Sequence, residues 1–215
     1  QDHGCPALVH QPEFSIAGVV GSELFHIDEE GDYDEYLIDA SALTRLESPE
    51  LGKIRRKIGR FERETQGRNI DISVSETVDS SFRDNILKAI DHWDSLFGRK
   101  NDLANNEGSA ITYSLDHFSE LGLRVLTLKV DGEIFGVCIY SATTDGSQYV
   151  LNHLRTDYSV PFINEFVTRS MAQVAVENSV DYLNLEMDLG IDNLRYHKAN
   201  FRPARMLKQY QLTNN

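Results

Sequence analysis

The residues best suited to chemistry lie near the end of the chain, where polar and apolar side chains alternate. Residues 182–188 read YLNLEMD, which predicts a strand with Asn184, Glu186 and Asp188 on one face. Carboxylates in such a row can hold a cation or accept a proton. Acid–base or charge-pairing chemistry is therefore the first hypothesis for this strand.

A row of cations follows on the next predicted element. Gly190 breaks the strand, and the pattern over about 191–201 predicts a helix. The cations at helical spacing are Arg195, Lys198 and Arg202. Each charged residue taken alone could equally have a structural role, with Asp188 or Asp192 as the helix N-cap and ion pairs joining strand to helix. The density of the cluster beside an apolar strand favours a site.

The two acids of this strand are expected to behave differently. We expect the carboxylate of Asp188 to reach Arg195 or Lys198 and the helix N-terminal amides, which lowers its pKa and makes it an anchor. Glu186 is expected to lie deeper in the sheet, which makes it the better candidate for a general base.

Composition limits the remaining possibilities. The chain has 215 residues, 40% of them hydrophobic, and contains no apolar run of about 18 residues that would predict a membrane span. Its two cysteines and scattered histidines form no disulfide framework and no metal-ligand spacing. We expect a cytoplasmic protein without a metal. The net charge of −13 opposes nonspecific attraction to nucleic acid or anionic lipid.

The order of predicted elements indicates a fold class. From about residue 69 the patterns give strand, helix, helix, three strands, helix, strand, helix and strand. This is the order of the GNAT acyltransferase fold, with a mixed, mostly antiparallel sheet and helices on both faces. In that fold the substrate cleft would lie between strands 148–155 and 182–188. His153 could line this cleft, although a position in the core or at the rim would explain it as well.

Two segments of the chain resemble motifs of a known family. Residues 188–190 (DLG), Leu194-Arg195, Lys198 and residues 201–203 (FRP) resemble a signature of the phosphatidylglycerol lysyltransferase C-terminal domain. The basic segment 51–61 resembles a helix of the same family, so the resemblance covers roughly residues 34–212. It implies tandem GNAT-like units related to Fem aminoacyltransferases of bacteria. On that basis, residues 1–45 are strands remaining from a preceding unit, and residues 46–215 form a GNAT-like domain with an N-terminal basic helix.

The resemblance implies transfer of an aminoacyl group from an aminoacyl-tRNA to a lipid or another small acceptor. It implies an enzyme without a cofactor, which would meet an anionic lipid only peripherally. Glu186 and Asp188 then take the catalytic roles. The substrate-binding residues would be Asn184, Arg195, Lys198, Arg202 and His153.

Two alternatives remain at this level. An acetyl-CoA-dependent N-acetyltransferase normally has a glycine-rich turn before the long helix, whereas residues 155–161 contain no glycine and place Asp157 where a diphosphate would sit. A non-catalytic module could instead bind RNA or anionic headgroups through the basic helix. The cations proposed for that contact are Lys53, Arg56, Lys57 and Arg60.

Overall fold

A computed structural model describes residues 7–10, 25–97 and 102–214. The chain divides into two compact units, one formed by residues 1–38 and 184–215 and the other by residues 39–183. The predicted boundary near residue 45 stays a prediction.

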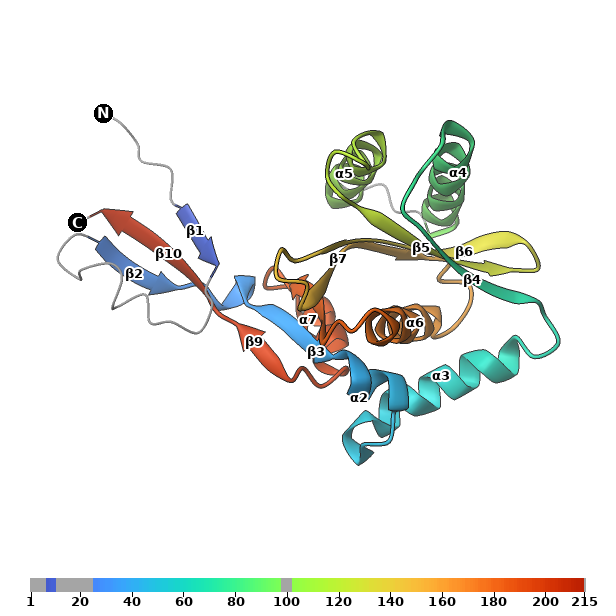
Figure 1. Ribbon diagram of the computed structural model, residues 1–215, viewed down its shortest axis with the longest axis horizontal. Helices are drawn as coiled ribbons and strands as arrows, with labels where there is room; N and C mark the ends of the chain where they lie inside the picture. Colours follow the sequence, from blue (N-terminus) through green and yellow to red (C-terminus); the bar gives the residue numbers. More distant parts are fainter. Residues whose placement is uncertain (1–6, 11–24, 98–101, 215) are drawn as a thin grey trace. The chain divides into compact units, whose positions relative to one another are not determined.

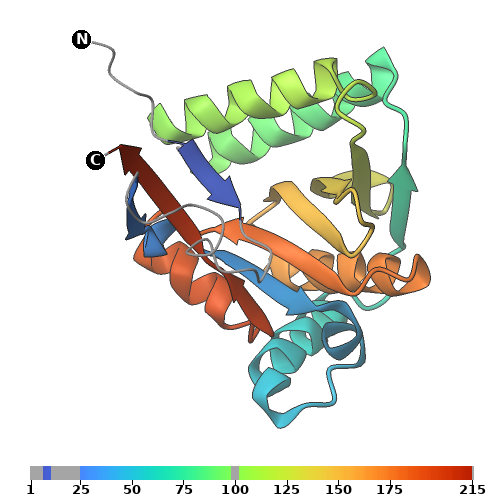
Figure 2. The same ribbon diagram turned by 60° about the vertical axis from the view of Figure 1, so that its left-hand side comes forward.

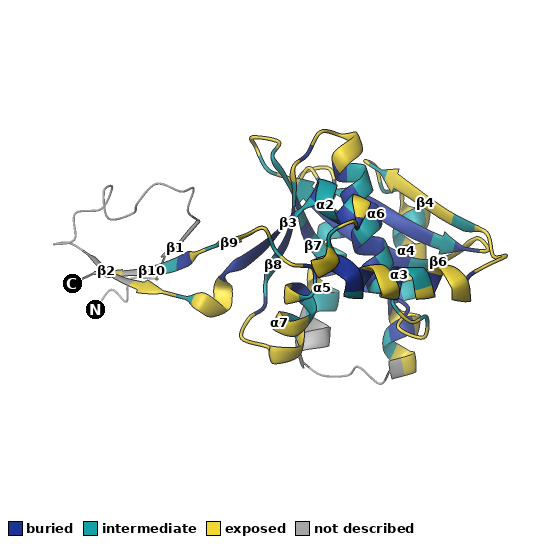
Figure 3. Cartoon of the chain, turned by 90° about the horizontal axis from the view of Figure 1, so that it is seen from below, coloured by how far each residue is buried: buried dark blue, intermediate teal, exposed yellow. Residues whose placement is uncertain are grey.

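The larger unit contains a four-stranded antiparallel sheet in the order β4, β5, β6, β7. Its strands are β4 (Ile70–Ser75), β5 (Arg124–Val130), β6 (Glu133–Ala142) and β7 (Gln148–Thr156). An Asp-Gly turn at 131–132 joins β5 to β6, with both residues at positive φ. β4 is mostly exposed (Figure 3), so the unit's apolar core lies under the other strands.

Helices cover both faces of this sheet. α4 (Ser80–Phe97) and α5 (Asp102–Asp116) lie side by side over one face, and α6 (Ile163–Glu177) and α3 (Gly52–Glu64) lie on the other (Figures 1 and 2). Ile86, Ile90 and Trp93 of α4 pack with Ile111 and Leu115 of α5 in one buried cluster. The short helices α2 (Ala40–Arg45) and η2 (Pro49–Leu51) precede α3.

The smaller unit brings the two ends of the chain together. β1 (Ala7–His10) and β2 (Phe25–Glu29) flank β10 (Gln209–Asn214) in an antiparallel three-stranded sheet. β3 (Glu35–Asp39) lies between β8 (Tyr182–Met187) and β9 (Arg205–Leu207). The 3-10 turn η1 (Gly31–Tyr33) precedes β3, and α7 (Asp192–Ala199) follows β8. The expected last strand over 205–212 is thus divided into β9 and β10.

The predicted fold class is confirmed. The sheet is mostly antiparallel and helices cover it. The order of elements after residue 69 is the one expected from the patterns.

Candidate functional site

The strand β8 does not alternate strictly, contrary to the expectation from its sequence. Leu183, Asn184 and Leu185 are buried in succession, and Glu186 has a φ of 57°. A left-handed residue inside a strand turns the chain and ends the two-residue periodicity. The Glu186 N–H donates to Oδ1 of Asn184 at 2.8 Å.

A tight turn connects β8 to α7 and depends on glycine. Leu189 and Gly190 have φ values of 55° and 71°, and the Ile191 N–H donates to the Asp188 carbonyl at 3.0 Å. Positive φ at both central residues with this bond is the pattern of a type I′ turn. A Cβ on Gly190 would lie 2.8 Å from Oδ2 of Asp32, so glycine suits both the backbone angle and the space.

Asp188 is the buried centre of a charge network whose other charged members, Arg195 and Asp32, are exposed. Its side chain is 2% exposed, and Arg195 of α7 donates to it from Nε and Nη2, each at 2.9 Å. The hydroxyl of Tyr36 on β3 donates to Oδ2 at 2.5 Å, and the Gly190 N–H donates to Oδ1 at 2.9 Å. Nη2 of Arg195 also donates to Asp32 at 2.7 Å. Asp188 therefore orients the turn, the helix and a neighbouring strand together.

These hydrogen bonds, together with burial, shift the pKa values of Asp188 and Tyr36. Hydrogen bonds from Arg195, aided by those from Tyr36 and Gly190, lower the pKa of Asp188 to about 2 although burial opposes the change. Burial, then the bond to Asp188, raises the pKa of Tyr36 to about 12. The lowered pKa of Asp188 confirms the expectation from the sequence. The backbone partner of Asp188 differs from the expected helix N-terminal amides. Asp188 accepts from the Gly190 N–H in the turn and does not cap α7, whose N-cap is Ile191.

Acid should remove the stability that ionised Asp188 contributes. Its pKa of about 2 in the folded chain lies below the ordinary 3.8. The contribution is therefore complete above about pH 4 and is lost as the pH falls through about 2. We expect the difference in unfolding free energy between wild type and Asp188→Asn to shrink over this window, as measured by urea unfolding. A difference that stays constant with pH would contradict this assignment.

Lys198 lies one turn further along α7, and its ammonium faces the backbone of β8. Nζ donates to the carbonyls of Leu185 and Met187, each at 2.5 Å, and the residue is 9% exposed. Burial lowers the pKa of Lys198 to about 8, while the charges of Glu186, Asp188 and Glu35 act in the opposite direction. Two of the three predicted cations, Arg195 and Lys198, are thus brought close to the predicted acids.

A second buried carboxylate lies beside this cluster and was not identified from the sequence. Glu35 on β3 is 9% exposed and accepts from Nδ2 of Asn184 at 2.5 Å and from Nε2 of Gln209 at 3.3 Å. Its neighbour Asp34 forms an ion pair with Lys208 at 2.8 Å. β3 therefore supplies both a carboxylate and the Tyr36 phenol to the polar surroundings of β8.

Two predicted site residues differ in exposure from what the pattern indicated. Glu186 is half-buried whereas Asp188 is buried, so the expectation that Glu186 lies deeper is wrong. Arg202 lies beyond the end of α7, at a φ of 55° before Pro203, so it is not on the helix as the spacing predicted. Its side chain is exposed and makes no hydrogen bond or ion pair within the described residues. Glu186 and Arg202 are consequently more accessible than the buried Asp188, whose partner Arg195 is itself exposed.

His153 belongs to the larger unit and has its own neighbours there. Its Nε2 lies 3.1 Å from Oγ of Ser114 on α5. Burial and the nearby charge of Arg155 lower the pKa of His153. Arg155 is 3% exposed and pairs with Asp94 and with Glu107, the latter at 3.1 Å. His153 and Arg155 thus join β7 to the helices above it, and a substrate role for His153 stays a prediction.

The cations of the basic helix α3 are partly engaged. Nζ of Lys57 lies 2.6 Å from the buried Glu165 of α6, and Nε of Arg60 lies 2.7 Å from Glu64. Both cations also lie over the ring of Phe162, at 5.7 and 5.4 Å from its centroid. Lys53 is half-buried and Arg56 is exposed. Arg56 and Arg60 are therefore the predicted binding cations that solvent reaches most easily.

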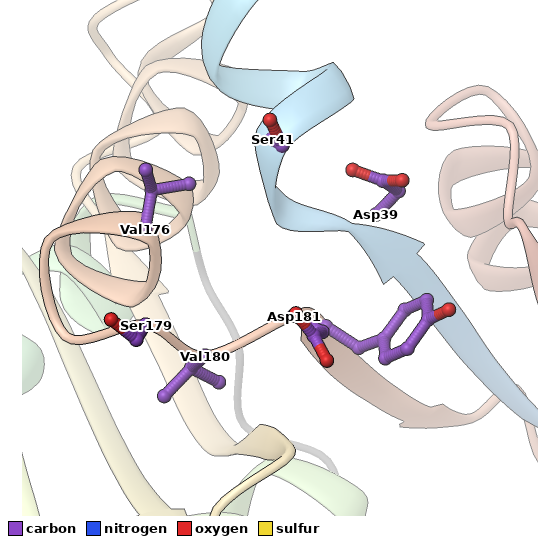
Figure 4. Close-up of a pocket in the computed structure, with 7 residues that line it drawn as sticks. Asp39, Ser41, Val176, Ser179, Val180 and Asp181 are labelled. Atoms are coloured by element: carbon purple, nitrogen blue, oxygen red, sulfur yellow. The ribbon is translucent and has the colours of Figure 1, made fainter.

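Two cavities of the larger unit contain none of the predicted site residues. One, of about 400 Å³, lies where the start of α2 meets the segment after α6 (Figure 4). Its lining includes Asp39, Ser41, Ser179, Asp181 and Tyr182. The other, of about 690 Å³, lies between α4 and the β5–β6 hairpin. Within the described ranges, no group of His, Cys, Asp or Glu side chains is arranged to hold a metal ion.

Comparison with known proteins places the chain among related folds. A family model described as phosphatidylglycerol lysyltransferase, C-terminal, matches residues 5–213. No protein of curated function matches the chain. Among its described residues, no helix is both long and apolar enough to cross a bilayer.

Three solved structures show the fold. A conserved protein of unknown function from Bacteroides thetaiotaomicron is 22% identical, with a TM-score of 0.80 over 92% of this chain and 65% of that one. The C-terminal domain of a putative lysylphosphatidylglycerol synthetase from Agrobacterium fabrum is 16% identical, with a TM-score of 0.68 over 99% and 69%. A tandem GNAT protein from the clavulanic acid biosynthesis pathway is 8% identical, with a TM-score of 0.50 over 97% and 62%. The chain thus has a GNAT-like fold and spans about two thirds of the length of these proteins.

Proposed function

Because this chain belongs to the family of phosphatidylglycerol lysyltransferase C-terminal domains, we propose that it is an acyltransferase that moves an aminoacyl group from an aminoacyl-tRNA-type donor to a lipid or another small acceptor. The observation that carries the proposal is the difference between two acids, Glu186 on β8 and Asp188 directly after it. Asp188 is tied to Arg195, while the half-buried Glu186 lies two residues earlier, in reach of solvent. One acid is an anchor and the other is accessible to a substrate.

The proposed step is a simple acyl exchange. The acceptor hydroxyl or amine attacks the ester carbonyl of the donor, a bond from carbon to the acceptor forms, and the bond to the tRNA oxygen breaks. Glu186 accepts the acceptor's proton and returns it to the departing tRNA hydroxyl. The exposed guanidinium of Arg202 is suited to a donor phosphate. In this scheme the chain's own residues move the proton, without a metal or a cofactor.

The acetyl-CoA alternative is less well supported by the segment before α6. Asp157 is buried and its Oδ1 accepts from the Ser159 N–H at 2.8 Å, so a carboxylate occupies the turn. Glu165, in the first turn of α6, adds a second negative charge, balanced by Lys57. A diphosphate would meet two acids at this helix start, where the glycine-rich turn of CoA-dependent enzymes presents free N–H groups.

A thermal-shift comparison of donors tests the proposal. A ligand that binds only the folded chain raises its thermal midpoint by mass action. We expect a charged tRNA or a non-hydrolysable aminoacyl-adenosine analogue to raise the midpoint, and acetyl-CoA and CoA to leave it unchanged. A shift with acetyl-CoA alone would indicate that acetyl-CoA, and not an aminoacyl-tRNA, is the donor.

We further propose that α3 holds the nucleic-acid part of the donor, in a cytoplasmic setting. The double variant Arg56→Gln/Arg60→Gln should weaken tRNA binding roughly 10-fold at low salt and reduce its salt dependence, because both cations are exposed. Lys57 is left in place because it pairs with the buried Glu165.

Lys88→Gln serves as the control for this measurement, because Lys88 is an exposed cation on the separate helix α4. Filter binding at several salt concentrations provides the readout. Equal weakening by the control and the double variant would show that general charge, and not α3, attracts the tRNA. Tight binding to phosphatidylglycerol vesicles without binding to tRNA would assign α3 to headgroups instead.

A further inference from the structure

The backbone around Glu186 is held in a conformation that a glutamate rarely adopts. Its φ of 57° lies in the left-handed region, which L-residues other than glycine enter only when their surroundings require it. Such residues concentrate at sites where a side chain must point in a set direction. The contacts that impose this angle therefore determine where the Glu186 carboxylate lies.

Lys198 binds the backbone carbonyls of the two residues that flank Glu186 in the sequence. Its ammonium donates to the carbonyl of Leu185 before Glu186 and to the carbonyl of Met187 after it, each at 2.5 Å. An ammonium has three N–H donors and no acceptor, so it can join two backbone carbonyls. Lys198 is buried, and two of its three N–H donors bind backbone carbonyls.

Asn184 holds the same residue from the other side. Its Oδ1 accepts from the Glu186 N–H at 2.8 Å, and its Nδ2 donates to Glu35 at 2.5 Å. Asn184 is 1% exposed, so both ends of its amide are committed in a site that solvent barely reaches. The pair with Glu35 fixes the orientation of the amide and leaves the oxygen aimed at Glu186.

We infer that Lys198 and Asn184 are positioning residues that hold Glu186 in place, and not ligands of the substrate. The catalytic part of this inference rests on the proposed role of Glu186 as general base. The charge of Lys198 faces three carboxylates, those of Glu186 and Asp188 on the β8 side and that of Glu35 on β3. One cation thereby fixes the backbone and balances the acids around it.

Lys198→Met tests the inference, because methionine keeps most of the apolar stem and removes the donors. We expect kcat for aminoacyl transfer to fall roughly 100-fold with KM nearly unchanged, as for a displaced catalytic group. The acidic limb of the pH profile of kcat should move to higher pH, because a nearby positive charge is lost. A raised KM with kcat and the pH profile intact would make Lys198 a substrate ligand and overturn the inference.

Hydrogen exchange gives a readout that does not need activity. The Glu186 amide should exchange at least about 10-fold faster in Lys198→Met, because its bond to Asn184 depends on the held backbone. Lys208→Met is the matched control, since Lys208 is a half-exposed lysine of the same unit that pairs with Asp34. Unchanged exchange at Glu186 in Lys198→Met, or an equal rise in the control, would overturn the positioning role.

The two readouts separate failure of the inference from failure of the proposed function. Wild type that transfers no group from any donor would refute the function, while the exchange comparison would still decide whether Lys198 holds the backbone. Lys198→Arg covers the case in which the methionine variant does not fold. It keeps a cation and donors, so we expect it to fold and its Glu186 amide to exchange at about the wild-type rate. Exchange at Glu186 about 10-fold faster than in wild type, although the cation is kept, would count against the inference.

Discussion

Replacing Arg195 with alanine is expected to lower the thermal midpoint by roughly 5–10 °C. The guanidinium makes two of the hydrogen bonds that hold the carboxylate of Asp188, each at 2.9 Å. Without it, a carboxylate that is 2% exposed keeps only the Tyr36 hydroxyl and the Gly190 amide. A buried charge that loses its partner is among the most destabilising local changes in a folded protein.

Arg202→Ala is the matched control for this prediction. Arg202 is an arginine of the same segment that is exposed and has no ion-pair partner among the described residues. Its removal should change the midpoint by no more than about 1 °C. Differential scanning calorimetry of both variants at neutral pH makes the comparison. Similar shifts for the two would mean that the pair of Arg195 with Asp188 does not stabilise the turn between β8 and α7.

Glu186→Gln is expected to slow transfer by a factor on the order of 10² to 10⁴ while KM changes little. Glutamine keeps the size of the side chain but cannot accept the proton of the acceptor. Its backbone N–H can still donate to Asn184, so the strand should keep its shape. Glu133→Gln, which changes an exposed acid in the β5–β6 hairpin, should leave both constants unchanged.

Asp188→Asn should give the opposite pattern. An amide can accept only through its single oxygen and would turn an NH₂ group toward Arg195 or Tyr36, so the anchor is weakened. We expect a raised KM and a lower thermal midpoint, with a smaller effect on kcat. Equal effects of the two acid variants on kcat would contradict the division between a base and an anchor.

The sequence was sufficient to predict the elements that carry the site and the pairing of their charges. The turn after β8, the helix after it and a cation of that helix beside Asp188 follow from local spacing, which left Arg195 and Lys198 open as the partner, and the structure pairs Asp188 with Arg195. The family resemblance based on residues 188–203 is confirmed. Such features are local, because a strand end, a glycine turn and the next helix turn are close in sequence and in space.

The contributions of β3 could not be predicted from spacing. Tyr36 reaches Asp188 across 152 positions of the chain, and Glu35 reaches Asn184 across 149. No periodicity links residues so far apart, so only the paired strands reveal these contacts. Nothing in the sequence around Tyr36 indicated that its phenol would bind the acid.

The irregular backbone at Glu186 also could not be predicted from the residue pattern. Alternating polar and apolar residues predict a regular strand whether or not one residue adopts a positive φ, because side-chain type does not record that angle. The same pattern gave the wrong depths for the two acids. Asp188 is buried because Arg195 and Tyr36 cover it and satisfy its charge, whereas Glu186 stays half-buried.

The most direct test of the account is the mass of the product formed by the purified chain. A charged tRNA is incubated with the chain and phosphatidylglycerol vesicles or a small amine, and the acceptor is analysed by mass spectrometry. We expect the acceptor to gain the mass of one aminoacyl group less the hydrogen it loses, and Glu186→Gln to form this product at least about 100-fold more slowly. An acceptor that gains an acetyl group from acetyl-CoA, or that gains nothing from the charged tRNA, would contradict it.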